Sequence, residues 1–155
     1  MKKILLILFF ISFSISNAQE LTWHTDMSKA SELAIKEKKP MLLFFTGSDW
    51  CGWCIRLQKE VLKTTEFEKW AKENVVLVEL DFPKRTPQDE TIKAQNHQLQ
   101  NMFQVRGYPT VWFVTPEKKE GKMNLSGLGN TGYVAGGPEK WLTVAKGIVS
   151  KTEEK

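Results

Sequence analysis

Two cysteines, Cys51 and Cys54, are the residues of this chain best suited to carry chemistry. They lie two residues apart in Trp50-Cys51-Gly52-Trp53-Cys54, and the chain of 155 residues contains no other cysteine. At this spacing one thiolate can attack a disulfide while the second is close enough to break the mixed disulfide that results. The pattern therefore predicts a dithiol oxidoreductase that needs no cofactor.

Other uses of a cysteine pair must be weighed against this one. A purely structural disulfide would close a very short loop, and chain entropy credits it with clearly less than the ~3 kcal/mol of a 15-residue loop. A zinc site needs four ligands, yet only His24 and His97 remain, each far along the chain. A c-type haem attachment needs histidine directly after the second cysteine, where Ile55 stands. Redox chemistry is favoured and we assign no metal ligands, with an inert disulfide and a metal site as the alternatives.

The first residues are typical of an export signal. Lys2 and Lys3 precede an apolar run over residues 4–15, and Ser16-Asn17-Ala18 supplies the small residues that signal peptidase requires. We predict a signal peptide over residues 1–18 and one domain over residues 19–155. The apolar run is shorter than the ~20 residues of a membrane span, so no stable span is expected, an uncleaved tether being the alternative.

Export has consequences for location and partners. The periplasm of a Gram-negative bacterium is the expected location, with secretion as the alternative, and a disulfide can persist in either place. The formal net charge is +4, and it falls to +2 when the two lysines of the signal are removed. This weak, dispersed charge argues against a nucleic-acid partner.

Hydrophobic patterning predicts alternating strands and helices. Apolar runs indicate strands over residues 41–45, 75–80 and 110–115, with a weaker hairpin partner over 123–128 after a charged turn at 117–122. Helical spacing indicates a helix from Asp26 or Ser28 to Lys38, one starting at Cys51, and others over residues 66–72, 90–103 and 138–149. Residues 21–26 are read as a lead-in and 82–89 as a loop. This order implies an α/β sandwich with a mixed sheet.

With these residues placed, the chain resembles the thioredoxin superfamily, in particular exported bacterial thioredoxin-like proteins with a Trp-Cys-Gly-x-Cys site. Three features carry the resemblance: the strand and turn that lead into the cysteine motif, Gly107-Tyr108-Pro109-Thr110 before an apolar strand, and Gly136-Gly137 before the last helix. It covers residues 19–155. It implies a thioredoxin fold, a three-layer sandwich with a central mixed sheet flanked by helices.

The resemblance also implies a conformation for one peptide bond. In this family the proline before that strand is cis, so Tyr108–Pro109 is expected to be cis rather than an ordinary trans bond. The backbone of Tyr108 would then face the sulfurs and pair with an extended substrate segment.

The motif residues take distinct roles in this interpretation. Cys51 at a helix N-terminus is the expected nucleophile, with a thiolate stabilised by the helix dipole, and Cys54 is the more buried resolving thiol. Gly52 is expected to let the backbone turn tightly. Trp50 and Trp53 are either packed beside the site or form a hydrophobic rim that binds peptide.

One departure from the family pattern concerns proton transfer. Thioredoxins bury an aspartate in the strand before the motif, and counting back from Cys51 places Phe45 there. Glu79 in the neighbouring strand is a candidate relay, with a solvent-facing strand residue as the alternative. Asp49 is interpreted as a turn residue. Lys84 and Arg85, with the prolines around them, are read as part of an ordinary surface loop, with contact to a partner as the alternative.

We therefore predict an exported thiol–disulfide oxidoreductase that reduces or isomerises disulfides of other exported proteins. A second, unidentified redox partner would regenerate the Cys51–Cys54 dithiol. The alternatives are a dithiol oxidase that forms disulfides, and a non-catalytic binding module with the same fold.

Overall fold

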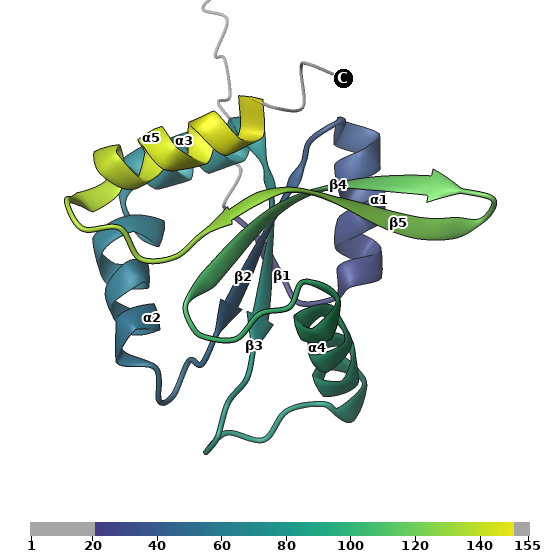
Figure 1. The fold of residues 1–155 in the computed structure, drawn as a ribbon, viewed down its shortest axis with the longest axis horizontal. Helices are drawn as coiled ribbons and strands as arrows, with labels where there is room; N and C mark the ends of the chain where they lie inside the picture. Colours follow the sequence, from purple (N-terminus) through teal and green to yellow (C-terminus); the bar gives the residue numbers. More distant parts are fainter. Residues whose placement is uncertain (1–20, 151–155) are drawn as a thin grey trace, which may run out of the picture.

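The computed structural model describes residues 21–150, so the predicted signal peptide over residues 1–18 lies outside the described residues. Its elements follow one another along the chain (Figure 1). They are β1 Trp23–His24, α1 Met27–Glu37, β2 Met41–Thr46, α2 Gly52–Leu57, the π-helical turn η1 Gln58–Leu62, α3 Thr65–Asn74, β3 Val76–Asp81, α4 Glu90–Met102, β4 Thr110–Lys119, β5 Lys122–Thr131 and α5 Gly137–Val149.

One five-stranded mixed sheet forms the middle of the molecule. Its strand order is β1-β3-β2-β4-β5, with β1, β3 and β2 parallel and with β4 antiparallel to both β2 and β5. Helices α2, α3 and α5 cover one face and α1 and α4 the other (Figure 1). The predicted α/β sandwich of thioredoxin type is confirmed.

Side-chain alternation in β2 divides the core between the two faces. Leu42 and Phe44 pack in the cluster that contains both cysteines, whereas Leu43 and Phe45 pack against α1 and α4. All six residues of β2 are buried, as the continuous apolar run predicts for a central strand. The strand is therefore held on both faces where it leads into the cysteine motif.

Two expectations about the sheet are wrong. Residues 21–26 are more than a lead-in, because Trp23 and His24 pair with β3 as a short edge strand. Residues 117–122 are not a turn, because β4 and β5 pair out to Lys119 and Lys122 and leave a two-residue turn with positive φ at Glu120 and Gly121. Such a tight turn matches the twist of paired strands, so pairing prevails over the local charge pattern.

Helix boundaries agree with the sequence to within one or two residues. Asp26 caps α1 by accepting a hydrogen bond from the Lys29 N–H, and α5 begins at Gly137 with Pro138 in its first turn. The helix after the cysteines departs from a plain α-helix at η1. Within residues 21–150 no helix combines the length and the apolar character needed to span a bilayer.

Candidate active site

The cysteine motif lies where β2 turns into α2. The backbone N–H groups of Trp50 and Cys51 both donate to the Gly47 carbonyl, at 3.2 and 2.8 Å, and this turn places Cys51 at the N-cap of α2. Cys51 and Cys54 form a disulfide with an S–S distance of 2.07 Å. The structure thus describes the oxidised form of the pair.

The two sulfurs differ in their surroundings. Cys51 retains 6% of its surface exposed and Cys54 none. The Sγ of Cys51 accepts a hydrogen bond from the Cys54 N–H at 3.2 Å, as the side chain of a helix cap does. An anionic sulfur at this position would therefore be stabilised by a backbone donor and by the start of the helix.

Gly52 follows Cys51 as the first residue of α2 and has no positive φ. A Cβ added to Gly52 would meet nothing within 4 Å. Neither its backbone conformation nor the space around it therefore requires glycine at this position.

Trp50 forms one flank of the disulfide, which we call the Trp50 flank and define as Trp50, Tyr108, Phe82 and Lys84. The Trp50 Nε1–H donates to the Phe82 carbonyl at 2.8 Å, and its ring meets Tyr108 edge-on with centroids 5.8 Å apart. The Lys84 ammonium lies 3.9 Å from the Trp50 ring centroid. Trp50 is nonetheless 37% exposed, so it is both packed beside the site and present on its rim.

Two carboxylates tether the turn before Cys51 to the loop after β3. Asp49 accepts backbone hydrogen bonds from Lys84, Arg85 and Thr86 at 3.0, 2.7 and 3.0 Å, and Asp81 accepts from both the N–H and the hydroxyl of Ser48. The bond from Lys84, more than those from the next two residues, lowers the pKa of Asp49. Asp49 does lie in the predicted turn, but it has a further role, because its carboxylate binds backbone N–H groups 35 to 37 residues away in sequence.

The Tyr108–Pro109 peptide bond is cis, as predicted. Within the Trp50 flank, Tyr108 is the residue that packs against both core clusters. Its hydroxyl accepts a hydrogen bond from Gln100 at 2.7 Å. Burial raises the pKa of this hydroxyl. Gly132 backs the same loop, since a Cβ added there would lie 3.2 Å from the Pro109 carbonyl oxygen.

Trp53 forms the other flank, which we call the Trp53 flank and define as Trp53, Arg56, Glu60 and Tyr133. The rings of Trp53 and Tyr133 lie 5.2 Å apart, and the Arg56 guanidinium lies over both, at 5.4 and 5.1 Å. Glu60 accepts hydrogen bonds from the Tyr133 hydroxyl and from Arg56 Nε, the latter at 2.8 Å. These two bonds, the one from Tyr133 most of all, lower the pKa of Glu60. Trp53 itself is 56% exposed.

Phe45 stands, counting back from Cys51, where thioredoxins bury an aspartate, and it packs against Phe82 and Phe103 in the cluster beneath α1 and α4. Phe44 is the neighbouring β2 residue in the cluster of the cysteines. An aromatic side chain at position 45 cannot transfer protons, so any relay must come from another residue.

Glu79 lies on the cysteine side of the sheet. It pairs in register with Phe44 and is two residues from Leu77, both of which belong to the cysteine cluster. The side chain is partly buried, and this burial, with a smaller effect from Asp81, raises the pKa of Glu79 while Lys63 opposes the rise. Glu79 is therefore not a fully solvent-facing strand residue, and its partly desolvated carboxyl keeps it a candidate for the proton relay.

The histidines lie at different distances from this site. His24 belongs to β1 at the far edge of the sheet, whereas His97, an exposed residue of α4, meets the Phe82 ring of the Trp50 flank edge-on. Among residues 21–150, no three His, Cys, Asp or Glu side chains gather where they could hold a metal ion.

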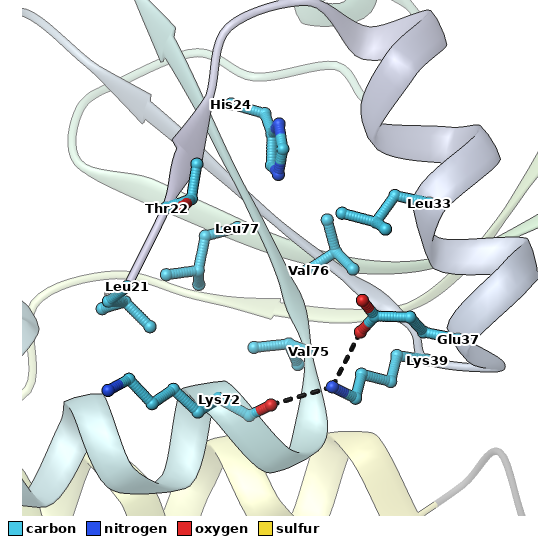
Figure 2. Close-up of a pocket in the computed structure, with 10 residues that line it drawn as sticks. All are labelled: Leu21, Thr22, His24, Leu33, Glu37, Lys39, Lys72, Val75, Val76 and Leu77. Atoms are coloured by element: carbon cyan, nitrogen blue, oxygen red, sulfur yellow. Dashed lines mark hydrogen bonds and ion pairs between the residues drawn. The ribbon is translucent and has the colours of Figure 1, made fainter. Parts of the chain in front are cut away.

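A separate cavity of about 190 Å³ lies at the other end of the sheet (Figure 2). Apolar residues around the first residues of β3 form its walls, and Lys39 Nζ donates at 2.8 Å to both Glu37 and the Lys72 carbonyl at its edge. The cysteine motif follows the C-terminal end of β2, at the edge of the sheet where the parallel strand β3 also ends. The cavity lies at the other edge, so it does not belong to the active site.

Comparison with known proteins agrees with this architecture. Residues 27–129 match the family described as thioredoxin-like domain. The disulfide bond reductase DsbH of Chlamydia pneumoniae is 36% identical over 119 residues, which cover 76% of this chain and 71% of the relative. The thioredoxin-related protein DsbJ of the same organism is 34% identical over 104 residues, 67% of this chain and 30% of DsbJ.

Solved structures give the same result. A DsbH oxidoreductase superposes with a TM-score of 0.74 at 31% identity, covering 97% of this chain and 95% of that one. A thioredoxin from Thermus thermophilus shares the fold, with a TM-score of 0.58 at 18% identity over 83% of this chain and 86% of that one.

A thioredoxin fold that holds a lone Cys-x-x-C pair as a disulfide at a helix N-cap defines a thiol–disulfide oxidoreductase. The chain belongs to the thioredoxin-like family.

Several residues around the site were not identified from the sequence. The fold brings together residues that are distant in sequence: Tyr133 binds Glu60 across 73 residues, and Asp81 binds Ser48 across 33. The i,i+4 spacing of Arg56 and Glu60 was a readable signal for their ion pair. Nothing in the sequence near Tyr133 indicates that it lies beside Trp53.

Proposed function

We propose that this protein reduces or isomerises disulfides of other exported proteins, with Cys51 as the nucleophile and Cys54 as the resolving thiol. The observation that carries this proposal is the unequal exposure of the two cysteines at one helix start, 6% for Cys51 and none for Cys54. Cys51 caps α2 and keeps part of its surface, whereas Cys54 is fully buried behind it. The DsbH relative is a disulfide bond reductase, which supports the same direction of electron flow for this chain.

The reaction proceeds by two thiol–disulfide exchanges. The Cys51 thiolate attacks one sulfur of the partner's disulfide, the bond between the partner's two sulfurs breaks, and the sulfur that leaves takes up a proton. The Cys54 thiolate then attacks Cys51 Sγ, which releases the partner's second sulfur and forms the Cys51–Cys54 disulfide. Two electrons pass to the partner, so a separate dithiol protein must supply two electrons to restore the reduced pair.

Residues around the disulfide bind the partner in this proposal. Trp50 and Trp53 present exposed aromatic surface on the two flanks, and Gly52 leaves the space between them open. Tyr108 and Pro109 provide the backbone against which an extended segment pairs. Affinity that depends on main-chain bonds tolerates many partner sequences, as a general reductant requires.

Glu79 is the proposed proton relay for Cys54. Its partly buried carboxyl lies on the cysteine side of the sheet and has a raised pKa, so it can hold a proton closer to neutral pH than an exposed glutamate. Glu79→Gln should slow the resolution of the mixed disulfide and change the pH profile of that step. An unchanged pH profile in the variant would leave Glu79 as an ordinary strand residue.

The decisive experiment uses single serine variants. Cys51→Ser should abolish reduction of a protein disulfide, whereas Cys54→Ser should accumulate mixed disulfides with partners that can be isolated from the source cell. The Cys51→Ser/Cys54→Ser double variant is the matched control and should trap nothing. Wild-type rates in both single variants would refute the assignment.

The direction of electron flow needs its own measurement. Trp53 between the cysteines cannot place positive charge on the thiolate as a protonated histidine would, so no strongly oxidising shift is expected. Equilibration of the purified protein with glutathione should give a potential at the reducing end of the range of about −270 to −120 mV spanned by these folds. A value at the oxidising end would favour a disulfide-forming oxidase.

Export to the periplasm is part of the proposal and rests on the amino-terminal sequence, Lys2 and Lys3 followed by the apolar run over residues 4–15. Fractionation of cells that produce the full chain should place the protein outside the cytoplasm. Mass spectrometry of its amino terminus should show a chain that starts at Gln19. Retention of residues 1–18 would support the uncleaved tether instead.

A further inference from the structure

Lys84 places a positive charge at the edge of the active site, and its backbone is fixed there by Asp49 of the turn before Cys51. Its N–H donates to Asp49 at 3.0 Å, while its exposed side chain extends along the face of Trp50 with the ammonium 3.9 Å from the ring centroid. Lys84 takes part in this tether through its main-chain N–H alone, so replacement of the Lys84 side chain leaves the bond to Asp49 in place. Trp50 directly precedes Cys51, so this charge borders the site of disulfide exchange.

No carboxylate pairs with the Lys84 ammonium within the described part of the chain. The acids nearby are occupied by other donors: Asp49 accepts three backbone N–H groups and Asp81 accepts from Ser48. The other flank differs, because Arg56 is already paired with Glu60. One side of the disulfide therefore offers an unpaired cation, and the other offers a neutralised one.

Lys84 and Tyr133 leave the sheet on opposite sides of the strand that leads into the motif. In the sheet, β3 borders β2 on one side and β4 and β5 follow on the other. Lys84 belongs to the loop after β3, whereas Tyr133 follows β5. A segment bound across the disulfide therefore meets the cation on one side of its reactive cysteine and the aromatic pair of Trp53 and Tyr133 on the other.

We propose that Lys84 makes this protein prefer disulfide partners that carry an acidic residue on one defined side of the reactive cysteine. The inference rests on the proposed function and adds the chemistry of the partner to it. A carboxylate at this position contacts an ammonium already oriented by Trp50, so it gains an ion pair at small cost in side-chain order. On the opposite side an acidic residue meets the Arg56–Glu60 pair and gains nothing.

The test compares four short capped peptides, each with one cysteine in a mixed disulfide with 2-mercaptoethanol. Glu or Gln stands two residues before or two residues after the cysteine, and all other residues are neutral. The second-order rate constant for reduction by the reduced protein is measured at low salt. Glu should exceed Gln by about 1.5-fold to fivefold on one side only, and the ratio should fall towards one at ~1 M salt.

Variants assign the effect to the proposed residue. Lys84→Met should bring the Glu-to-Gln ratio to one, and Lys84→Glu should invert it. Lys118→Met is the matched control, because Lys118 is an exposed lysine at the far end of the β4–β5 hairpin, and it should keep the wild-type ratio.

Each outcome bears on a different claim. If the protein reduces the neutral bis(2-hydroxyethyl) disulfide but shows no preference, an equal preference on both sides, or a preference that survives Lys84→Met, the inference is overturned and the proposed function stands. If it cannot reduce the neutral disulfide either, the proposed function fails and the inference fails with it. A one-sided preference that disappears with Lys84 supports both.

Discussion

The Trp50 flank and the Trp53 flank present exposed tryptophans beside the same disulfide, yet they are fixed by different means. Trp50 is held by long-range backbone bonds, since Asp49 and Asp81 join its turn to the loop after β3. Trp53 contacts Arg56 of its own helix and Tyr133, and Glu60 of η1 binds both of these side chains. A loop tether can be lost as a unit, whereas a side-chain network can be weakened one contact at a time.

The largest expected effect comes from Gly47→Ala, which should break the Trp50 flank. The new Cβ would lie 2.5 Å from Cε2 and Nε1 of Trp50, so the rigid indole must move and lose its bond to Phe82. Overpacking of this kind costs about 1–3 kcal/mol of the free energy of unfolding. Gly52→Ala is the control, since nothing lies within 4 Å of its added Cβ. Chemical denaturation should separate the two variants, and equal losses would contradict the packing described for Trp50.

The next effect concerns the loop tether. Asp49→Ala removes the acceptor for the N–H groups of Lys84, Arg85 and Thr86, so hydrogen exchange at these three amides should accelerate by roughly tenfold or more. Asp49→Asn keeps one acceptor oxygen and should give an intermediate rate. Amides within α4 serve as the internal reference, and exchange that rises equally there would indicate global rather than local loosening.

These tethers mark the boundary of what the sequence could predict. The strand predicted over 41–45, Asp26 as one of two candidate caps and the cis bond before Pro109 follow from local patterns and from the family resemblance. Asp49 was placed in its turn, but its tethering role could not be predicted, because it depends on a loop 35 residues away that the sequence cannot place.

The same reason explains an error in the sheet. The long β4–β5 hairpin was cut short because charged residues tolerate strand pairing when a partner strand is present. The redox chemistry could be predicted from the sequence because it depends on residues close together in the chain, Cys51 and Cys54. The two flanks could not be predicted, because each is assembled from separate elements.

A smaller effect is expected on the Trp53 flank. Tyr133→Phe removes the hydroxyl that donates to Glu60 but keeps the ring against Trp53 and Arg56. The rate of disulfide exchange with a protein substrate should change by about twofold or less, because the remaining contacts hold the flank. Glu60→Gln should have the larger effect of the two, as it also loses the charge that pairs with Arg56. A double variant worse than the sum of both would show coupling beyond this one bond.

The smallest expected difference between the flanks is their response to acid. Hydrogen bonds from the Lys84 backbone and from Tyr133, respectively, lower the pKa values of Asp49 and Glu60 in the folded protein. Their stabilising contribution is therefore complete above the unfolded-state pKa values, about 3.9 and 4.3, and is lost as the pH falls through the lower folded values. The indole N–H resonances of Trp50 and Trp53 should stay constant from pH 7 to about pH 5 and shift together only in stronger acid. A shift of either signal near neutral pH would contradict this assignment.

The two edge strands of the sheet, β1 and β5, are poorly suited to pairing with a strand of another protein. β1 is two residues long, and β5, the opposite edge, carries a register shift against β4 near Phe113 and ends in a hairpin rich in lysine and glutamate. Short, irregular and charged edges resist the addition of another strand. A protein that exchanges disulfides with other proteins meets their chains at close range, and these edges disfavour pairing with them strand to strand.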